Sequence, residues 1–122
     1  MLFRSSVTTL LNLEMAPTKE MIAIAERVKP HCITLVPERR EERTIEGGLD
    51  VVRERASLES IVQRAHCASI RVSFFIAVDD DQIRMSHQLG AEQIELHTGE
   101  YCNAKFDKRT HELEREIGRA HV

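Results

Sequence analysis

Three features are missing from the sequence, and each absence excludes a class of protein. No segment approaches the ~20 consecutive apolar residues that a helix needs to cross a bilayer, so we expect no membrane role. The 17 basic residues face 20 acidic ones, and a net charge of −3 provides no global field for gathering nucleic acid. The three cysteines lack C-x-x-C spacing, which fits a reducing compartment better than a disulfide scaffold. We therefore expect a cytoplasmic protein with neither a membrane nor a nucleic-acid partner.

Two adjacent His-Cys pairs raise the question of a metal site. They are His31-Cys32 and His66-Cys67. Neighbouring residues of a strand point to opposite faces, so in a strand neither pair would present both side chains to one ion. We therefore expect neither pair to hold a metal ion.

What the chain does contain is an alternation of strand-like and helix-like segments. With 122 residues, 42% of them hydrophobic, it suits one domain that can bury a core. Apolar runs of strand length occupy residues 8–15, 31–38, 70–78 and 92–99. Helical spacing predicts helices at residues 16–30, 56–68 and 82–90, and a further one starting near 107. The first two helices are expected to bury Met21, Ile24, Ala25 and Val28, and Leu58, Ile61, Val62 and Ala65, respectively.

The alternating order predicts an α/β fold with a parallel sheet and right-handed crossovers. About four βα units fit a small doubly wound sheet. They equally fit half of a (β/α)8 TIM barrel, which usually takes ~250 residues. The pattern alone leaves both architectures open.

Each predicted strand has an acidic residue near its carboxyl end, the edge at which such folds place their sites. These residues are Glu14, Glu38, Asp79 and Glu95. We interpret Asp79 as a helix cap, because Asp79-Asp80-Asp81 leads into a helix whose amino end favours negative charge, with Gly90 at its other end.

Strand periodicity sets Glu14 and Glu95 apart from the other two. Asn12 and Glu14 share one face of their strand, and Glu95 and His97 share one face of theirs. The apolar pattern suggests a sheet covered on both faces, where a carboxylate is costly unless it is bonded or performs chemistry. A general acid or base and a structural, hydrogen-bonded Glu both remain open.

The segment "LVPERREERTIEGGLDV", residues 35–51, passes from an apolar run through six charged residues to a glycine pair. Its charged run has three residues of each sign, so it is no nucleic-acid patch. Gly47-Gly48 could serve as a hinge, allow close backbone approach to a ligand, or begin a helix that offers N–H groups to an anion. A solvated connection is the alternative.

Three long blocks resemble the pyridoxine 5'-phosphate synthase family, which closes the pyridine ring in bacterial vitamin B6 synthesis. They are "NLEMAPTKEMIAIAERVKPH", "LVPERREERTIEGGLDV" and "IELHTGEYCNAK", in family order and spacing between Asn12 and Lys105. The resemblance implies a (β/α)8 barrel of which this chain holds the third to sixth strands. It also implies condensation of 3-amino-2-oxopropyl phosphate with 1-deoxy-D-xylulose 5-phosphate, without a cofactor, in a homo-oligomeric enzyme.

The resemblance further implies roles for three residues. Glu14 falls on the family's catalytic acid/base, and Glu95 on a glutamate thought to stabilise a charged transition state. Thr44 takes the place of a substrate-binding threonine in a mobile loop, and Ile45 stands where relatives often have a second threonine. The family's catalytic histidines lie on strands outside this chain, so His97 is given no role.

The chain is expected to be a fragment. Residues 1–115 would be part of one barrel domain, and residues 116–122, "EIGRAHV", match the translated start of a sequencing adapter and are expected to be non-native. Half a barrel leaves open sheet edges, so we expect this chain alone to be unstable and inactive. The rival reading is a non-catalytic α/β module that binds phosphate or a protein.

Overall fold

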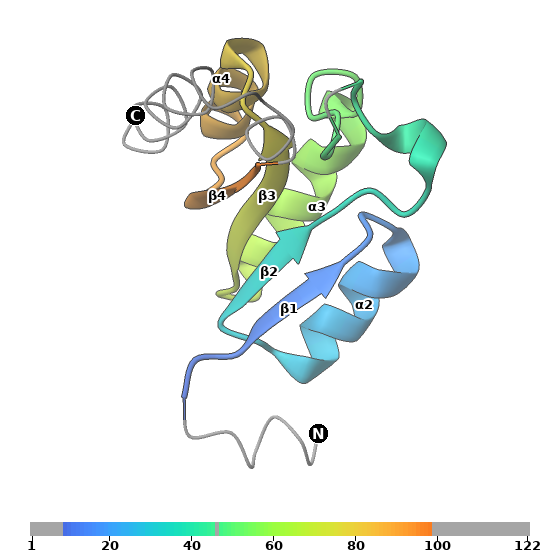
Figure 1. Ribbon diagram of the computed structural model, residues 1–122. Helices are drawn as coiled ribbons and strands as arrows, with labels where there is room; N and C mark the ends of the chain where they lie inside the picture. Colours follow the sequence, from blue (N-terminus) through green and yellow to red (C-terminus); the bar gives the residue numbers. More distant parts are fainter. Residues whose placement is uncertain (1–8, 46, 99–122) are drawn as a thin grey trace.

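Four strands alternate with three α-helices in the computed structural model, which describes residues 9–45 and 47–98 (Figure 1). In chain order the elements are β1 (Asn12–Met15), α2 (Lys19–Val28), β2 (Cys32–Leu35), η1 (Arg40–Glu42), α3 (Arg55–Cys67), β3 (Arg71–Ala77), α4 (Asp80–Gln88) and β4 (Gln93–His97). The predicted elements are therefore confirmed within residues 9–98. The helix expected near residue 107 and the tail at 116–122 lie outside the described residues.

The strands form one parallel sheet in the order β1-β2-β3-β4, so neighbours in the chain are neighbours in space. Met15 pairs with Leu35, Leu35 with Phe74, and Phe74 with Ile94. This row of apolar residues crosses the whole sheet on one face. Parallel pairing confirms the prediction from the strand–helix alternation.

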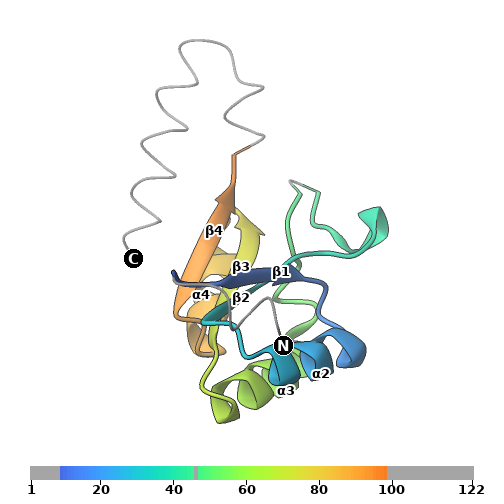
Figure 2. The ribbon, with the colours of Figure 1, turned by 90° about the horizontal axis from the view of Figure 1, so that it is seen from below.

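The three helices lie on the same face of this sheet (Figure 2). Their apolar residues and those of the strands form one core, whose fully buried large side chains include Ile22, Ile33, Leu35, Leu58, Val72, Phe74 and Ile76. A doubly wound sheet carries helices on both faces, whereas a (β/α)8 barrel keeps them all outside. Sequential strand order with helices on one face therefore identifies a partial barrel.

The helix ends follow the expected chemistry. The carboxylate of Asp79 accepts hydrogen bonds from the backbone N–H groups of Asp81 (2.9 Å) and Gln82 (3.1 Å), so Asp79 is the N-cap of α4, as predicted. Thr18 caps α2 by accepting from the Met21 N–H at 3.1 Å. Gly90 follows α4 with a φ of 87°, which suits a residue without a Cβ.

The buried face of α3 is the predicted one, but that of α2 is rotated. In α2 the buried residues are Ile22 and Ala25, while Met21, Ile24 and Val28 are half-buried. Apolar residues occupy every position from 21 to 25, so the apolar stripe of this helix is wider than the four predicted residues and includes Ile22. Packing of α2 against the sheet and α3 decides which of these side chains are buried.

The glycine pair does not begin a helix, so that expectation was wrong. Helix α3 starts at Arg55, and the chain first crosses the end of β3, where the Leu49 N–H donates to the Phe75 carbonyl at 2.7 Å. A Cβ added to Gly48 would lie 2.8 Å from the Ala77 nitrogen. Gly48 therefore permits this close crossing.

Polar contacts join the helices to one another and to this crossing. The side-chain oxygen of Gln82, on α4, accepts from the Val51 N–H at 2.7 Å, and its amide donates to the Asp50 carboxylate at 2.9 Å. Arg64 of α3 pairs with Glu26 of α2, and its hydrogen bond lowers the pKa of the Glu26 carboxyl. These contacts hold the outer layer together.

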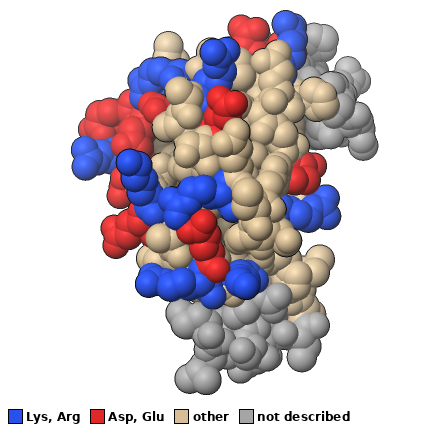
Figure 3. Space-filling model, turned by 180° about the vertical axis from the view of Figure 1, so that it is seen from behind, with Lys and Arg blue, Asp and Glu red and all other residues tan. Residues whose placement is uncertain are grey.

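Charges on the surface seen from behind are interspersed rather than gathered by sign (Figure 3). Basic and acidic side chains alternate there, and no large single-sign patch of the kind that binds nucleic acid is visible on that side. Within residues 9–45 and 47–98, no helix is long and apolar enough to span a bilayer.

Candidate active site

The sheet face opposite the helices, here called the open face, carries polar side chains. Strand register places on it Asn12, Glu14, Cys32, Thr34, Ser73, Phe75, Glu95 and His97. In a closed barrel this face points inward. Both predicted carboxylates, Glu14 and Glu95, are therefore on the interior side.

Thr34 connects the outer strands across this face. Its hydroxyl oxygen lies 2.9 Å from the Asn12 side-chain oxygen and 3.4 Å from a carboxylate oxygen of Glu95. A hydroxyl has one proton, so it donates to one of these oxygens at a time; rotating the Asn12 amide would let Asn12 donate and leave that proton for Glu95. Thr34 is buried, so its contacts orient Glu95 from beneath.

Glu14 and Glu95 differ in exposure. Glu14 is exposed, and Glu95 is half-buried. The expectation of burial on both faces is confirmed for the central strands, where Thr34 and Ser73 are buried on the open face, but it is wrong at Glu14 on the edge strand β1. Ser73, which pairs with Thr34 in the sheet, keeps a buried hydroxyl with no partner among the described residues.

A cavity of about 400 Å³ joins the two carboxylates at the carboxyl ends of the strands. Its lining comes from three strands and from the segment that follows β2: Glu14, Val36, Pro37, Glu38, Arg39, Arg40, Arg43, Gly48, Phe75, Glu95 and His97. A concave site with a few convergent polar groups is the usual form of a small-molecule site. Its position is the one that barrels use for chemistry.

His97 forms part of the wall between β4 and the glycine pair. Its ring contacts Phe75 edge-on, with ring centroids 5.5 Å apart. A Cβ added to Gly47 would lie 2.9 Å from Nε2 of His97, and the φ of Gly47 is 95°. The first glycine therefore permits contact with the His97 ring, as the second permits contact with β3.

Thr44 lies in the turn before the glycines. Its hydroxyl donates to the Gly47 carbonyl, its N–H donates to the Gly48 carbonyl at 3.1 Å, and Arg43 pairs with Leu49 on either side of the turn. Thr44 is not among the described residues that line the cavity. In this conformation its hydroxyl supports the turn.

The His-Cys pairs lie apart from the cavity. Nδ1 of His31 accepts from the Leu11 N–H at 2.7 Å, and Nε2 of His66 lies 2.6 Å from Glu92. The described ranges contain no group of three or more His, Cys, Asp or Glu side chains that could hold a metal ion. Burial raises the pKa of the Cys32 thiol.

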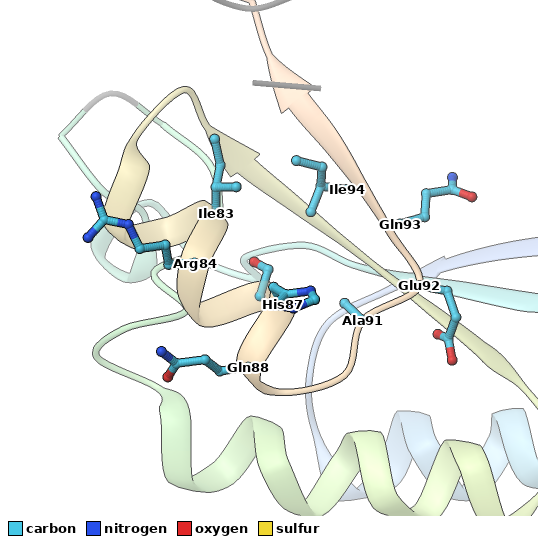
Figure 4. Close-up of a pocket in the computed structure, with 9 residues that line it drawn as sticks. Ile83, Arg84, His87, Gln88, Ala91, Glu92, Gln93 and Ile94 are labelled. Atoms are coloured by element: carbon cyan, nitrogen blue, oxygen red, sulfur yellow. The ribbon is translucent and has the colours of Figure 1, made fainter. Parts of the chain in front are cut away.

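A second hollow, of about 440 Å³, lies between α4 and β4 (Figure 4). Its apolar walls come from Ile83 of α4, from Ala91 in the turn before β4 and from Ile94 of β4, with Arg84 and His87 beside them. Ile94 belongs to the face that the helices cover, because it pairs with Phe74. This hollow is on the packing side of the sheet, away from the carboxylates.

Comparison with known proteins agrees with the family resemblance seen in the sequence motifs. The family model described as pyridoxal phosphate biosynthesis protein PdxJ matches residues 1–121. The chain belongs to this PdxJ family. Proteins named pyridoxine 5'-phosphate synthase are 49% identical over 92% of the chain in Prochlorococcus marinus and 54% identical over 89% in Xanthobacter autotrophicus.

The PdxJ chain spans less than half the length of these curated relatives. The matched regions cover 46% of the Prochlorococcus protein and 42% of the Xanthobacter protein. PdxJ proteins are barrel enzymes of pyridoxine biosynthesis, so four parallel βα units amount to part of one barrel.

The structure places Glu14 and Glu95 at one cavity and adds residues that sequence reasoning missed. Thr34 could have been found, because strand periodicity in "CITL" puts it opposite Ile33 and Leu35. The three arginines of the cavity could not, because a balanced run of charges does not reveal which side chains face a site.

Proposed function

We propose that the complete protein to which this chain belongs is a pyridoxine 5'-phosphate synthase. It would condense 3-amino-2-oxopropyl phosphate with 1-deoxy-D-xylulose 5-phosphate and release phosphate and water. The main support is the meeting of Glu14 and Glu95 at one cavity of a PdxJ chain. A homo-oligomer in the cytoplasm belongs to the same proposal.

Glu14 would act as the acid/base, and Glu95 as the electrostatic stabiliser. Imine formation, phosphate elimination, water addition and ring closure each move protons on and off one bound skeleton, which carboxylates beside it can do. The exposure of Glu14 keeps it accessible to substrate, while the contact with Thr34 holds Glu95 in place.

Thr44 would contact substrate when the segment between β2 and α3 closes over the cavity. Closure would keep water from the reactive imine. Because its hydroxyl is engaged with Gly47 in this conformation, closure would have to exchange that bond for one to substrate.

The test uses the restored enzyme, by which we mean the full-length Xanthobacter relative with residues 9–98 of this chain in place of its matching segment. Glu14→Gln keeps the size of the side chain and removes its proton transfer. We expect kcat to fall by roughly 100-fold or more while substrate still binds. Product formation and equilibrium binding are measured together, with exposed Glu59→Gln as the control. Near-normal turnover in the Glu14 variant would refute the assignment.

The 122-residue chain alone is proposed to be inactive and prone to association. The open face and the edges at β1 and β4 would lack the rest of the barrel. The expected result is no pyridoxine 5'-phosphate from the two substrates and a broad, aggregated profile in size-exclusion chromatography. Turnover by the purified chain would contradict this.

A further inference from the structure

The charged segment after β2 turns all three of its arginines toward one cavity, although its sequence is balanced. Arg39, Arg40 and Arg43 line the cavity that holds Glu14 and Glu95. Of the three glutamates of this segment, Glu38 also lines the cavity, whereas Glu41 and Glu42 do not, among the residues described.

Local geometry brings two of the arginines to the same side. The segment forms the 3₁₀ turn η1, in which residues three apart lie on the same side. Arg40 and Arg43 have this spacing, and the Arg43 N–H donates to the Arg40 carbonyl at 3.2 Å. Glu42 turns back, where its carboxylate accepts from the Glu38 N–H at 3.2 Å and lines a smaller hollow beside Thr18.

The guanidinium groups of the three arginines are free of ion pairs with the acidic side chains of the described residues. None of them forms an ion pair within 4.0 Å with an acidic group among residues 9–45 and 47–98. Glu14 and Glu95 lie on the strands, at the floor of the same cavity, while the arginines lie on the loop wall. The loop wall of the cavity therefore carries three arginines and one glutamate, Glu38, and its floor carries the carboxylates of Glu14 and Glu95.

We propose that Arg39, Arg40 and Arg43 form a phosphate-binding wall that holds a phosphate monoester with its carbon skeleton over Glu14 and Glu95. This rests on the proposed function and names the part of the site that recognises the phosphate. Guanidinium groups match phosphate oxygens by paired hydrogen bonds, which carboxylates on the floor cannot make.

Phosphate binding to the wall would also favour closure of the loop over the cavity. Exposed arginines that have no acidic partner among the described residues gain most when an anion arrives between them, because the phosphate replaces water at several donors at once. Phosphate bound to the wall would draw the turn containing Thr44 toward the strands. Binding and closure would then be one event.

The test compares two triple variants of the restored enzyme that lose the same charge. One carries Arg39→Gln, Arg40→Gln and Arg43→Gln. The control carries Arg27→Gln, Arg53→Gln and Arg55→Gln, three exposed positions that line none of the cavities described. Inorganic phosphate is titrated into each protein by calorimetry, and KM is measured separately for the two phosphorylated substrates.

We expect the wall variant to lose phosphate binding and to raise KM for one or both substrates roughly 10- to 100-fold, with the control close to the parent. The substrate whose KM changes identifies the phosphate that the wall holds. The parent's KM should also rise with ionic strength, and the wall variant's much less, because exposed charges are screened.

Two results would refute the proposal that these arginines form a phosphate-binding wall. Phosphate affinity and KM in the wall variant equal to those of the control would do so, as would a parent that binds no phosphate while turning over normally. Lysine at the three positions should recover part of the binding, which a purely structural role would not predict. An inactive parent that still binds phosphate through these arginines would instead refute the synthase assignment alone.

Discussion

The two faces of the sheet are made from alternating residues of the same strands, yet one packs against the helices and the other lines the cavity. Phe74 and Phe75 are neighbours in β3 and show the difference most directly. Phe74 is 0% exposed beneath the helices, whereas Phe75 is half-buried on the open face and lines the cavity with His97. One face holds the barrel together, and the other leaves its polar groups available for chemistry.

The largest expected effect comes from exchanging the two phenylalanines for alanine in the restored enzyme. Phe74→Ala should lower the free energy of unfolding by about 3–5 kcal/mol, because it leaves a cavity in the core. Phe75→Ala should cost much less stability but disturb His97 and reduce turnover. Denaturant melts and kinetics check both; equal losses of stability would show that the faces are not divided as described.

A smaller effect is expected at the glycines beside the site. Gly48→Ala puts a Cβ 2.8 Å from the Ala77 backbone at a φ of 80°. Gly90→Ala has a similar φ of 87°, but its nearest contact is 3.5 Å away, at His66. Positive φ alone costs about 1–2 kcal/mol, so Gly90→Ala should lose that much and Gly48→Ala distinctly more. Equal unfolding free energies would contradict the close crossing over β3.

The smallest effect concerns the cysteines and reports how far water reaches the open face. Burial raises the pKa of Cys32, whereas Cys67 is exposed at the end of α3. Cys32 therefore has less thiolate than an ordinary cysteine at the same pH and is also less accessible, so the exposed Cys67 should react first with a thiol reagent. The Cys32 rate should keep rising at higher pH. A restored enzyme with no other cysteines separates the two rates; faster reaction at Cys32 would contradict its burial.

Much of the fold follows from local patterns that need no tertiary information. Period-two alternation identifies the strands, period 3.6 identifies the inward face of α3, and the Asp79 cap marks the start of α4. The same alternation puts Glu14 and Glu95 on one side of the sheet. Each of these signals depends on residues close together in the chain.

Other features depend on how distant parts meet, and sequence reasoning missed them or left them open. Placement of the three helices on one face decided between a doubly wound sheet and a partial barrel. The path of the chain over β3, rather than a helix start, explains Gly47 and Gly48. The inward direction of α2 was misjudged because its apolar stripe is wider than the four predicted residues and includes Ile22.

By itself, then, the sequence determined the strand–helix order, the shared face of Glu14 and Glu95, and through its long motifs the PdxJ family. Only the tertiary structure decided that Thr34 bonds toward Glu95, that His97 packs on Gly47, and that three arginines of a balanced run line the same cavity. The physical reason is the distance along the chain over which each kind of interaction acts. Periodicity and capping act over a few residues, whereas contacts across a sheet and the direction of a loop depend on parts of the chain that meet only when it folds.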